Sequence, residues 1–273
     1  MWVWVNPRPP EGAISLPRQW FIRSGKEYYK YPMRYELYYW PSIQGRGEFV
    51  RLALEEVGAN YIDVARKKGR GWGLDAMLQL MRDSESGRVP FAPPFLRAGK
   101  LLIGQTANIL QYLGPRLDLA PKAEVSRLWA HQLQLTVEDF IIEIHNTHHP
   151  IAGALYYHEQ KREAKCRAEY FISERAQQFL IYFEGIRQKN PGSKDWMIGR
   201  SLSYVDLSMF QLIAGLRYAF PNMMQRLEPE IRGLIALHDQ VMRRPNIAAY
   251  LASRRRLPFN EDGIFRHYPE LDL

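Results

Sequence analysis

Hydrophobic residues follow a regular pattern from residue 33 to residue 116. Phe49, Ala53 and Val57 recur every four residues, which predicts a helix over 46–57. Short apolar runs predict strands, and the turn at Ala98-Gly99 joins two of them into a hairpin. The expected elements are, in order, a strand at 35–40, the helix at 46–57, a strand at 61–65, a helix at 72–81, strands at 95–97 and 101–103, and a helix at 105–113. The order β-α-β-α-β-β-α predicts an α/β domain over 33–116.

Strand signals disappear beyond the prolines at 115 and 121. Ile172, Ala176 and Phe179 recur in alternating steps of four and three residues, which predicts a helix with one stripe facing a core. Ser203 and Asp206 have the spacing of a capping box, so a helix should begin there. We expect helices at 123–147, 160–188, 203–218, 228–243 and 246–253. The sequence therefore predicts a second, all-helical domain with a C-terminal tail over 122–273.

Residues 1–32 differ in character from the rest of the chain. They contain five prolines and scattered tryptophans but no sustained apolar period, which indicates an irregular N-terminal extension. A cleavable organellar presequence is one reading, because arginines are present, although the amphipathic pattern of such peptides is weak. Met33 stands immediately before the first regular segment, so a native start at that residue is an equally simple account.

The net charge of +8 and the isoelectric point near 9.5 favour anionic partners through long-range attraction. The cations are dispersed, however, and the densest clusters are Lys67, Lys68 and Arg70 and the run from Arg254 to Arg256. No zinc-finger spacing, aromatic RNA-binding motif or long basic helix accompanies them. We therefore expect a basic solvated surface and no nucleic-acid partner.

Cysteine content and hydropathy exclude several further classes of protein. Cys166 is the single cysteine, which excludes an intrachain disulfide and any CxxC redox or cysteine-rich zinc site and fits a reducing compartment. No apolar run approaches the roughly 20 residues that span a bilayer, so no membrane association is expected.

Several short motifs occur in one order along the chain: Tyr35–Pro41, Gly45–Glu48, Arg51-Leu52, Pro94–Leu96, Gln105-Thr106, Val137–Asp139, and Ile198-Gly199 with Ser203–Asp206. In this order and at these spacings, over residues 34–256, they resemble the cytosolic glutathione transferases of the Pi, Mu and Sigma types. The resemblance implies a thioredoxin-like glutathione-binding domain at 33–116 and the family's all-helical domain at 122–273. It also implies a homodimer in the cytoplasm.

The activity implied by the resemblance is conjugation of glutathione to a hydrophobic electrophile, which needs a thiolate near neutral pH. A free thiol has a pKa of about 8.5, and lowering it by about 2 units takes about 2.7 kcal/mol. One hydrogen bond to the charged sulfur supplies about 1.5 to 3 kcal/mol. By resemblance the donor is Tyr39, with Ser42 as the alternative, because some relatives use a serine shortly after this proline. No cysteine lies in this loop, which argues against the thiol-transfer branch of the family.

The resemblance also implies which residues hold the rest of glutathione. Thr106, at a helix start, would donate to the γ-glutamyl carboxylate, with Gln105 beside it. Asp139 of the neighbouring subunit would meet the γ-glutamyl ammonium. The candidates for the glycyl carboxylate are Trp72, Arg46 and one of Lys67, Lys68 and Arg70.

Two positions depart from the family's pattern. The residue before the cis-proline normally pairs with the cysteinyl unit through its backbone N–H and C=O, but Pro93, which precedes Pro94, has no N–H. Its absence costs on the order of 1 kcal/mol of binding. Ala76 stands where the family usually has a lysine, four residues beyond the tryptophan.

The electrophile pocket is expected between the two domains, lined by His145, His148, His149, Tyr156, Phe259, Phe265 and Tyr268. The three histidines have a spacing that suits a metal, but Pro150 ends the helix and no acidic or thiol partner is evident, so no metal is expected. Two other functions remain open. A glutathione-dependent isomerase or peroxidase would use the same thiolate, and a non-catalytic interaction protein would keep only the fold.

Overall fold

The computed structural model describes residues 21–23, 26–28, 33–82 and 87–272, and it divides into two compact units, residues 1–33 and 34–273. In the first unit, Phe21–Arg23 (β1) pairs in antiparallel fashion with Lys26–Tyr28 (β2). These six residues therefore form a short hairpin within the segment that the sequence predicts to be irregular. The rest of that prediction lies outside the described residues.

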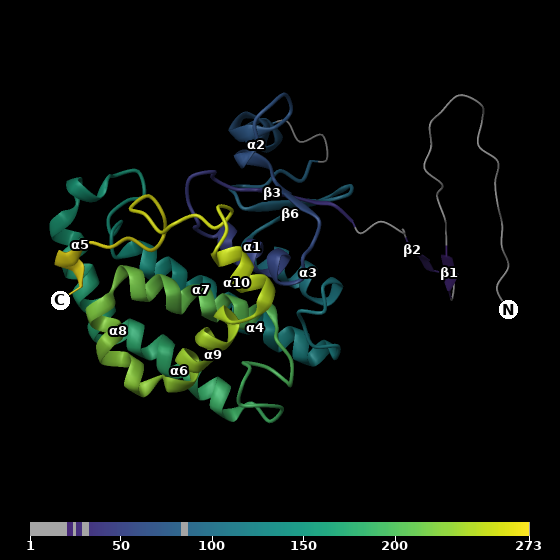
Figure 1. Ribbon diagram of the computed structural model, residues 1–273. Coiled ribbons are helices and arrows are strands. Elements are labelled where there is room, and N and C mark those ends of the chain that lie inside the picture. Colours follow the sequence, from purple (N-terminus) through teal and green to yellow (C-terminus); the bar gives the residue numbers. More distant parts are fainter. Residues whose placement is uncertain (1–20, 24–25, 29–32, 83–86, 273) are drawn as a thin grey trace. The chain divides into compact units, whose positions relative to one another are not determined.

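The second unit contains a four-stranded mixed sheet (Figure 1). Its strands are Tyr35–Tyr38 (β3), Tyr61–Asp63 (β4), Phe95–Ala98 (β5) and Leu101–Gly104 (β6), in the order β4-β3-β5-β6. β3 and β4 are parallel because a helix crosses between them, whereas β5 and β6 form an antiparallel hairpin beside β3. β4 and β6 are the two edges of the sheet.

Helices cover both faces of this sheet because side chains alternate between the faces of a strand. Gly47–Glu56 (α1) and Thr106–Leu113 (α3) pack against the face that carries Leu37. Gly73–Arg82 (α2) and the turn Val64–Arg66 (η1) pack on the other face, where Met77 lies in one cluster with Tyr38. The two faces therefore have separate apolar cores.

The rest of the chain is helical in the described residues, as the lower part of Figure 1 shows. Its elements are Gly114–Arg116 (η2), Glu124–Asn146 (α4), Tyr157–Glu159 (η3), Lys161–Tyr170 (α5), Phe171–Arg175 (η4, a π turn), Ala176–Lys189 (α6), Tyr204–Ala219 (α7), Pro221–Leu227 (α8), Glu228–Glu230 (η5), Arg232–Met242 (α9), Pro245–Leu251 (α10) and Pro269–Leu271 (η6). α7 is buried on nearly every side and contacts α1, α4, α8 and α9. No helix in the described ranges is both long and apolar enough to cross a membrane.

The predicted fold class is confirmed, and most elements agree within one or two residues. The capping box at the start of α7 is present, since Ser203 N–H donates to the Asp206 carboxylate at 2.7 Å. Two helix predictions were wrong in detail. The helix expected over 160–188 contains the π turn η4, and the one expected over 228–243 begins only at 232. Pro229 lies in the short turn η5, and α8 before it begins at Pro221, a helix that the pattern did not predict.

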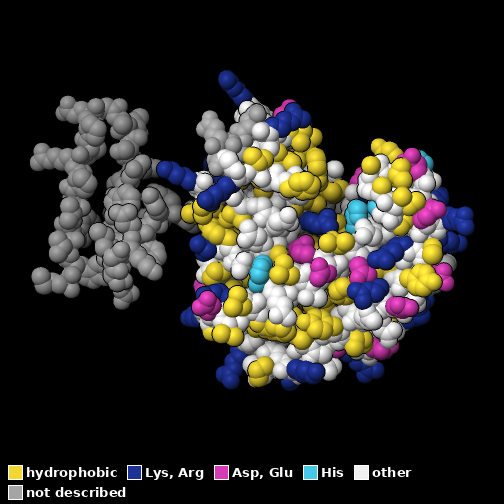
Figure 2. Space-filling model, turned by 180° about the vertical axis from the view of Figure 1, so that it is seen from behind, with side chains coloured by type: hydrophobic (Ala, Val, Ile, Leu, Met, Phe, Trp, Pro, Cys, Tyr) yellow, Lys and Arg dark blue, Asp and Glu magenta, His cyan; other side chains and the backbone are white. Residues whose placement is uncertain are grey.

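Lys and Arg side chains do not form a continuous patch on the face of the molecule that Figure 2 shows. On the face shown in Figure 2, they are interspersed with acidic and apolar side chains of the described residues. This arrangement agrees with the dispersed cations of the sequence.

Candidate functional site

A cavity of about 540 Å³ lies between the sheet domain and α4. Five residues that the sequence predicted to bind glutathione line it together: Arg46, Pro93, Pro94, Gln105 and Thr106. They come from the start of α1, the loop before β5 and the start of α3. Their common location is the main result of the fold for function, because these segments are far apart in the sequence.

The loop before β5 forms one wall of the cavity. The peptide bond between Pro93 and Pro94 is cis, as expected for Pro94 from the resemblance. Pro94 is buried, and the next residue, Phe95, pairs with Tyr38 of the central strand. Pro93 has no N–H to donate into the cavity, so only its carbonyl is available to a ligand.

The first turn of α3 forms the second wall. Gln105, its N-cap residue, has a φ of 69°, an uncommon conformation for a residue other than glycine. The hydroxyl of Thr106 is buried and has no hydrogen-bond partner in the described structure. A helix N-terminus offers free N–H groups and partial positive charge. This wall can therefore hold an anionic group with one further donor, the Thr106 hydroxyl.

α4 forms the third wall and contributes two polar residues that the sequence did not predict. Burial raises the pKa of Glu138 to about 7, although the Gln134 amide and the nearby Arg46 guanidinium act in the opposite direction. His131 also lines the cavity, and its Nδ1 is buried with no hydrogen-bond partner among the described residues. Helical spacing explains why Glu138 and His131 both face the cavity, because residues 131, 135, 138 and 142 share one face of α4.

Asp139, the predicted carboxylate on α4, does not line the cavity. It is exposed, one position beyond Glu138, on the outer surface of the helix. Within a single chain, the acid that faces the cavity is therefore Glu138.

Tyr39, the predicted thiolate partner, follows β3 and is almost fully buried. Its hydroxyl oxygen accepts a hydrogen bond from the backbone N–H of Arg46 at 2.8 Å. Gly45 covers the hydroxyl so closely that a Cβ at this position would overlap it. Tyr39 does not line the cavity of about 540 Å³ in this conformation, so its place at the mouth of the site stays a prediction.

Three other predicted residues lie away from the cavity. Ser42 is exposed, and its carbonyl accepts a hydrogen bond from the Asn260 side chain at 2.9 Å. Trp72 is half-buried before α2, with the Lys67 ammonium 5.9 Å from its ring centre. Lys68 is exposed in the adjoining loop. Neither Trp72 nor Lys68 lines the cavity that holds the other candidates.

The expected electrophile pocket is closed by the C-terminal tail. Only about 10 Å³ remains free between Gln44, Gly45 and tail residues 258–265, roughly the space that one water molecule needs. Side chains fill the space, because the Phe265 ring packs closely on Gly215 and is itself buried. A direct tie holds the tail in place, since the Gln44 amide donates to the Leu257 carbonyl.

Most of the residues expected in the electrophile pocket lie next to one another beside the tail, whereas Tyr156 lies apart from them. The rings of His145 and His149 are stacked with their centres 4.7 Å apart, and His148 links this pair to the tail through a 2.8 Å contact with the Ile264 carbonyl. Tyr156 is 71% exposed on the outer surface. Phe265 belongs to the apolar core of the helical domain. The role of these residues as walls of an electrophile pocket stays a prediction.

Comparison with known proteins agrees with this architecture. Residues 145–254 match the family model described as the glutathione S-transferase C-terminal domain. The glutathione S-transferase of Plasmodium yoelii yoelii is 24% identical over 213 residues, covering 78% of this chain and 90% of that protein. Among solved structures, the Pi-class glutathione S-transferase of Onchocerca volvulus aligns with a TM-score of 0.64 at 20% identity, covering 84% of this chain and 98% of that one. A structure named prostaglandin synthase D of Nilaparvata lugens aligns with a TM-score of 0.61 at 20% identity, covering 82% and 100%.

A thioredoxin-like sheet domain followed by an all-helical domain is the fold that these solved structures share with the chain. Together with the match to the C-terminal domain model and the curated relatives, this shared fold confirms the resemblance to the cytosolic glutathione transferases.

Proposed function

We propose that the protein binds glutathione in the cavity between the sheet domain and α4 and activates its thiol for conjugation to an electrophile. One observation carries the proposal: five predicted contact residues from three separate segments line a single cavity of about 540 Å³. Residues chosen without regard to a site would not be expected to converge in this way. The names of the curated relatives support the same reading.

The polar groups of the cavity match the ends of glutathione. The buried Thr106 hydroxyl and the N-terminus of α3 suit the γ-glutamyl carboxylate. Glu138 suits the γ-glutamyl ammonium. The positive charge of a bound ammonium would favour the ionised form of this carboxylate. Arg46 is the remaining cation of the cavity and suits the glycyl carboxylate. In this proposal Trp72 and Lys68 have no contact with glutathione in this conformation.

Tyr39 is the proposed donor to the sulfur. Its hydroxyl accepts the Arg46 N–H, so its own proton remains free to be donated to a thiolate. Burial raises the pKa of Tyr39, which keeps the hydroxyl protonated at neutral pH. The N-terminus of α1 adds partial positive charge beside the same hydroxyl. For the sulfur to reach Tyr39, the loop at 42–46 must shift, since Gly45 covers the hydroxyl.

A homodimer is part of the proposal. Leu128, Leu135 and Ile142 are exposed at seven-residue spacing on α4, and Phe91, beside the cavity, is 95% exposed. Apolar residues at this spacing share one face of a helix, and such a face is typical of an interface. A second copy on this face would add its own Asp139 near the cavity.

The proposal extends to the electrophile, the cellular compartment and the physiological role. We infer a cytoplasmic detoxification enzyme, by analogy with the relatives. The tail must move before a hydrophobic electrophile can bind beside the sulfur, because the space there is nearly filled. An isomerase that uses the same thiolate is a second candidate, favoured by the neighbour named prostaglandin synthase D.

A non-catalytic interaction protein is a third candidate, favoured by Pro93 and by the closed tail. Calorimetric titration of the purified protein with glutathione, followed by a chromogenic electrophile assay on the same sample, separates the transferase from the other two candidates. Saturable binding with turnover supports the transferase. Binding without turnover of any electrophile indicates the isomerase or the non-catalytic protein, and no binding at millimolar glutathione refutes the proposed site.

A further inference from the structure

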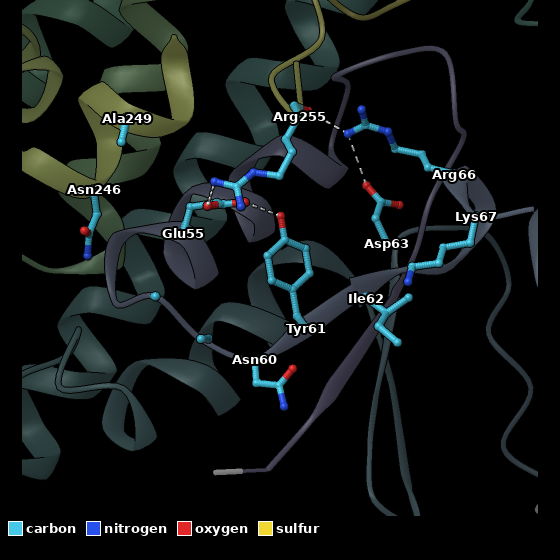
Figure 3. Close-up of a pocket in the computed structure, with 12 residues that line it drawn as sticks. Glu55, Asn60, Tyr61, Ile62, Asp63, Arg66, Lys67, Asn246, Ala249 and Arg255 are labelled. Carbon is cyan, nitrogen blue, oxygen red and sulfur yellow. Dashed lines mark hydrogen bonds and ion pairs between the residues drawn. The ribbon is translucent and has the colours of Figure 1, made fainter. Parts of the chain in front are cut away.

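A second cavity, of about 570 Å³, lies along the open edge of the sheet (Figure 3). Its floor is the segment from Gly58 to Asp63, which includes the edge strand β4. Asn246 and Ala249 of α10 form one wall, and Arg255 closes the cavity from the segment after α10. None of its lining residues belongs to the proposed glutathione cavity, so it is a separate site.

The edge strand has backbone groups that the sheet does not use. Tyr35 N–H donates to the Asn60 carbonyl at 2.9 Å, and Tyr35 is the register partner of Tyr61. In a parallel ladder, alternate residues direct their N–H and C=O groups to the same side. The groups of Ile62 therefore face β3, whereas Tyr61 N–H, Tyr61 C=O and Asp63 N–H face the cavity. Unpaired groups of this kind are a template for an added strand.

Each of the two densest basic clusters of the sequence contributes one residue to the lining of this cavity, Lys67 and Arg255. The Arg66 guanidinium donates to the Arg255 carbonyl at 2.6 Å and to the Arg254 carbonyl at 3.4 Å. Arg66 thereby joins the loop that begins at Lys67 to the run of arginines after α10. The contact brings together cations that are nearly 190 positions apart in the chain.

The acids of the cavity are already neutralised. Glu55 accepts hydrogen bonds from the Tyr61 hydroxyl at 2.7 Å and forms an ion pair with Arg255 at 2.9 Å, as the dashed lines of Figure 3 show. Asp63 is paired with the buried Arg51 at 2.7 Å. Lys67 is exposed and, among the described residues, forms no ion pair. The cavity therefore has an excess of positive charge beside free backbone groups.

We propose that this cavity, which we call the edge groove, binds an acidic peptide segment in extended conformation. The segment adds beside β4 as a further strand, through Tyr61 and Asp63, and its carboxylates face Lys67, whose charge no described acid neutralises. Charge complementarity selects acidic side chains, and the backbone groups select a polypeptide over other polyanions. This site is independent of the proposed glutathione chemistry.

Two other roles of the edge groove would also account for its charged residues. Charged side chains beside a short edge strand can serve only to prevent edge-to-edge association. Alternatively, the cations can attract any polyanion without backbone pairing. A test of the proposal must therefore separate strand addition from charge alone.

The test uses the full chain and a fluorescein-labelled hexapeptide in which glutamate alternates with threonine or valine. A second peptide keeps the glutamates but has proline at the alternate positions, which removes the N–H groups that a strand needs. Fluorescence anisotropy should show saturable binding of the first peptide, and binding of the second should be at least about tenfold weaker, a difference of ~1.4 kcal/mol. Amide hydrogen exchange should slow at Tyr61 and Asp63 when the first peptide is bound.

Matched variants place the binding in the edge groove. Ala249→Glu puts a negative charge in its wall and should weaken binding about tenfold, whereas Ala248→Glu, exposed on the same helix outside the groove, should not. Lys67→Ala should weaken binding about two- to fivefold, and the neighbouring Lys68→Ala should leave it unchanged.

Each contrary outcome refutes the proposal. Equal binding of the two peptides, or competition by inorganic polyphosphate at equal charge with no change in exchange at Tyr61, shows charge attraction only. If neither peptide binds at low salt, the charged residues serve only to prevent edge-to-edge association of β4. Equal effects of Ala249→Glu and Ala248→Glu place any binding elsewhere.

Discussion

The hydroxyl oxygen of Tyr39 accepts a 2.8 Å hydrogen bond from the backbone N–H of Arg46. Arg46 immediately precedes α1, so the bond joins the end of the central strand to the start of the helix that follows it. The same residue, Arg46, contributes its side chain to the proposed glutathione cavity. One residue thus connects the candidate thiolate donor with the candidate binding site.

Tyr39→Phe tests this connection. The variant loses only the hydroxyl, so it should fold, but it should raise the pKa of bound glutathione by about 1 to 2 units. The value of kcat/KM near neutral pH should fall by about 10- to 100-fold. Ultraviolet titration of the bound thiolate measures the first effect and a chromogenic assay the second. Ser42→Ala is the matched control; if it shifts the thiol pKa and Tyr39→Phe does not, the donor is Ser42.

Gly45→Ala tests the close contact over the Tyr39 hydroxyl. Gly45 has a φ of 44°, and its added Cβ would overlap the hydroxyl, whereas Gly58 has a φ of 60° and open space around it. Both alanine variants carry the strain of a positive φ, about 1 kcal/mol. Gly45→Ala should cost about 1 to 3 kcal/mol more in the free energy of unfolding, measured with urea. Equal losses in the two variants would show that the contact is looser than described.

Glu138→Gln tests the half-buried carboxylate of the cavity. The pKa of Glu138 is raised to about 7, so the folded state holds a proton that the unfolded state releases near pH 4.5. Between these two values the folded state binds more protons, and its stability falls as the pH rises, with the full penalty reached above about pH 7. Glutamine removes this penalty.

The variant should therefore gain stability relative to the parent protein between about pH 5 and pH 8, by up to about 3 kcal/mol. Urea unfolding at both pH values measures the change. Asp139→Asn is the control, because its carboxylate is exposed and the substitution should have a small effect at either pH. A Glu138→Gln effect that is the same at both pH values would contradict the raised pKa.

Asp206→Ala tests the start of α7, the central helix of the helical domain. The fully buried carboxylate accepts bonds of 2.7 Å from the backbone N–H groups of Met197 and Ser203. Alanine leaves both donors buried and unpaired, so unfolding should become easier by about 2 to 4 kcal/mol. Ser203→Ala removes only one hydroxyl and should cost about 1 kcal/mol. Thermal or urea unfolding measures both, and equal losses would show that the two N–H bonds contribute little.

Local motifs predicted the fold well because each describes contacts within a few residues. The capping box at Ser203 and the hairpin at Ala98-Gly99 are of this kind, and both are present. The helical period of α4 places Glu138 on the same face as His131, whereas the family motif predicts Asp139, the residue beside it. Here the signal was available in the sequence.

Long-range packing could not be predicted in the same way. The tail closes the electrophile region through contacts such as Gln44 with Leu257, more than 200 residues apart. The edge groove likewise depends on the contact between Arg66 and Arg255. Neither pair has a spacing or pattern that a single sequence reveals, since the contact follows from the completed fold. The close contact of Gly45 with the Tyr39 hydroxyl likewise follows from the completed fold.

Leu128→Glu tests the proposed homodimer. Leu128 is 59% exposed on the apolar face of α4, and it lies outside the lining of the glutathione cavity. A buried negative charge in a symmetric interface occurs twice, so the variant should be a monomer in analytical ultracentrifugation while the parent protein is a dimer. Ile181→Glu, at an exposed position of α6, is the matched control and should stay dimeric. Glutathione affinity measured on the same samples then tests Asp139: it should fall in the Leu128→Glu monomer if the partner's carboxylate reaches the site, and an unchanged affinity would leave Glu138 as the acid that binds the ammonium.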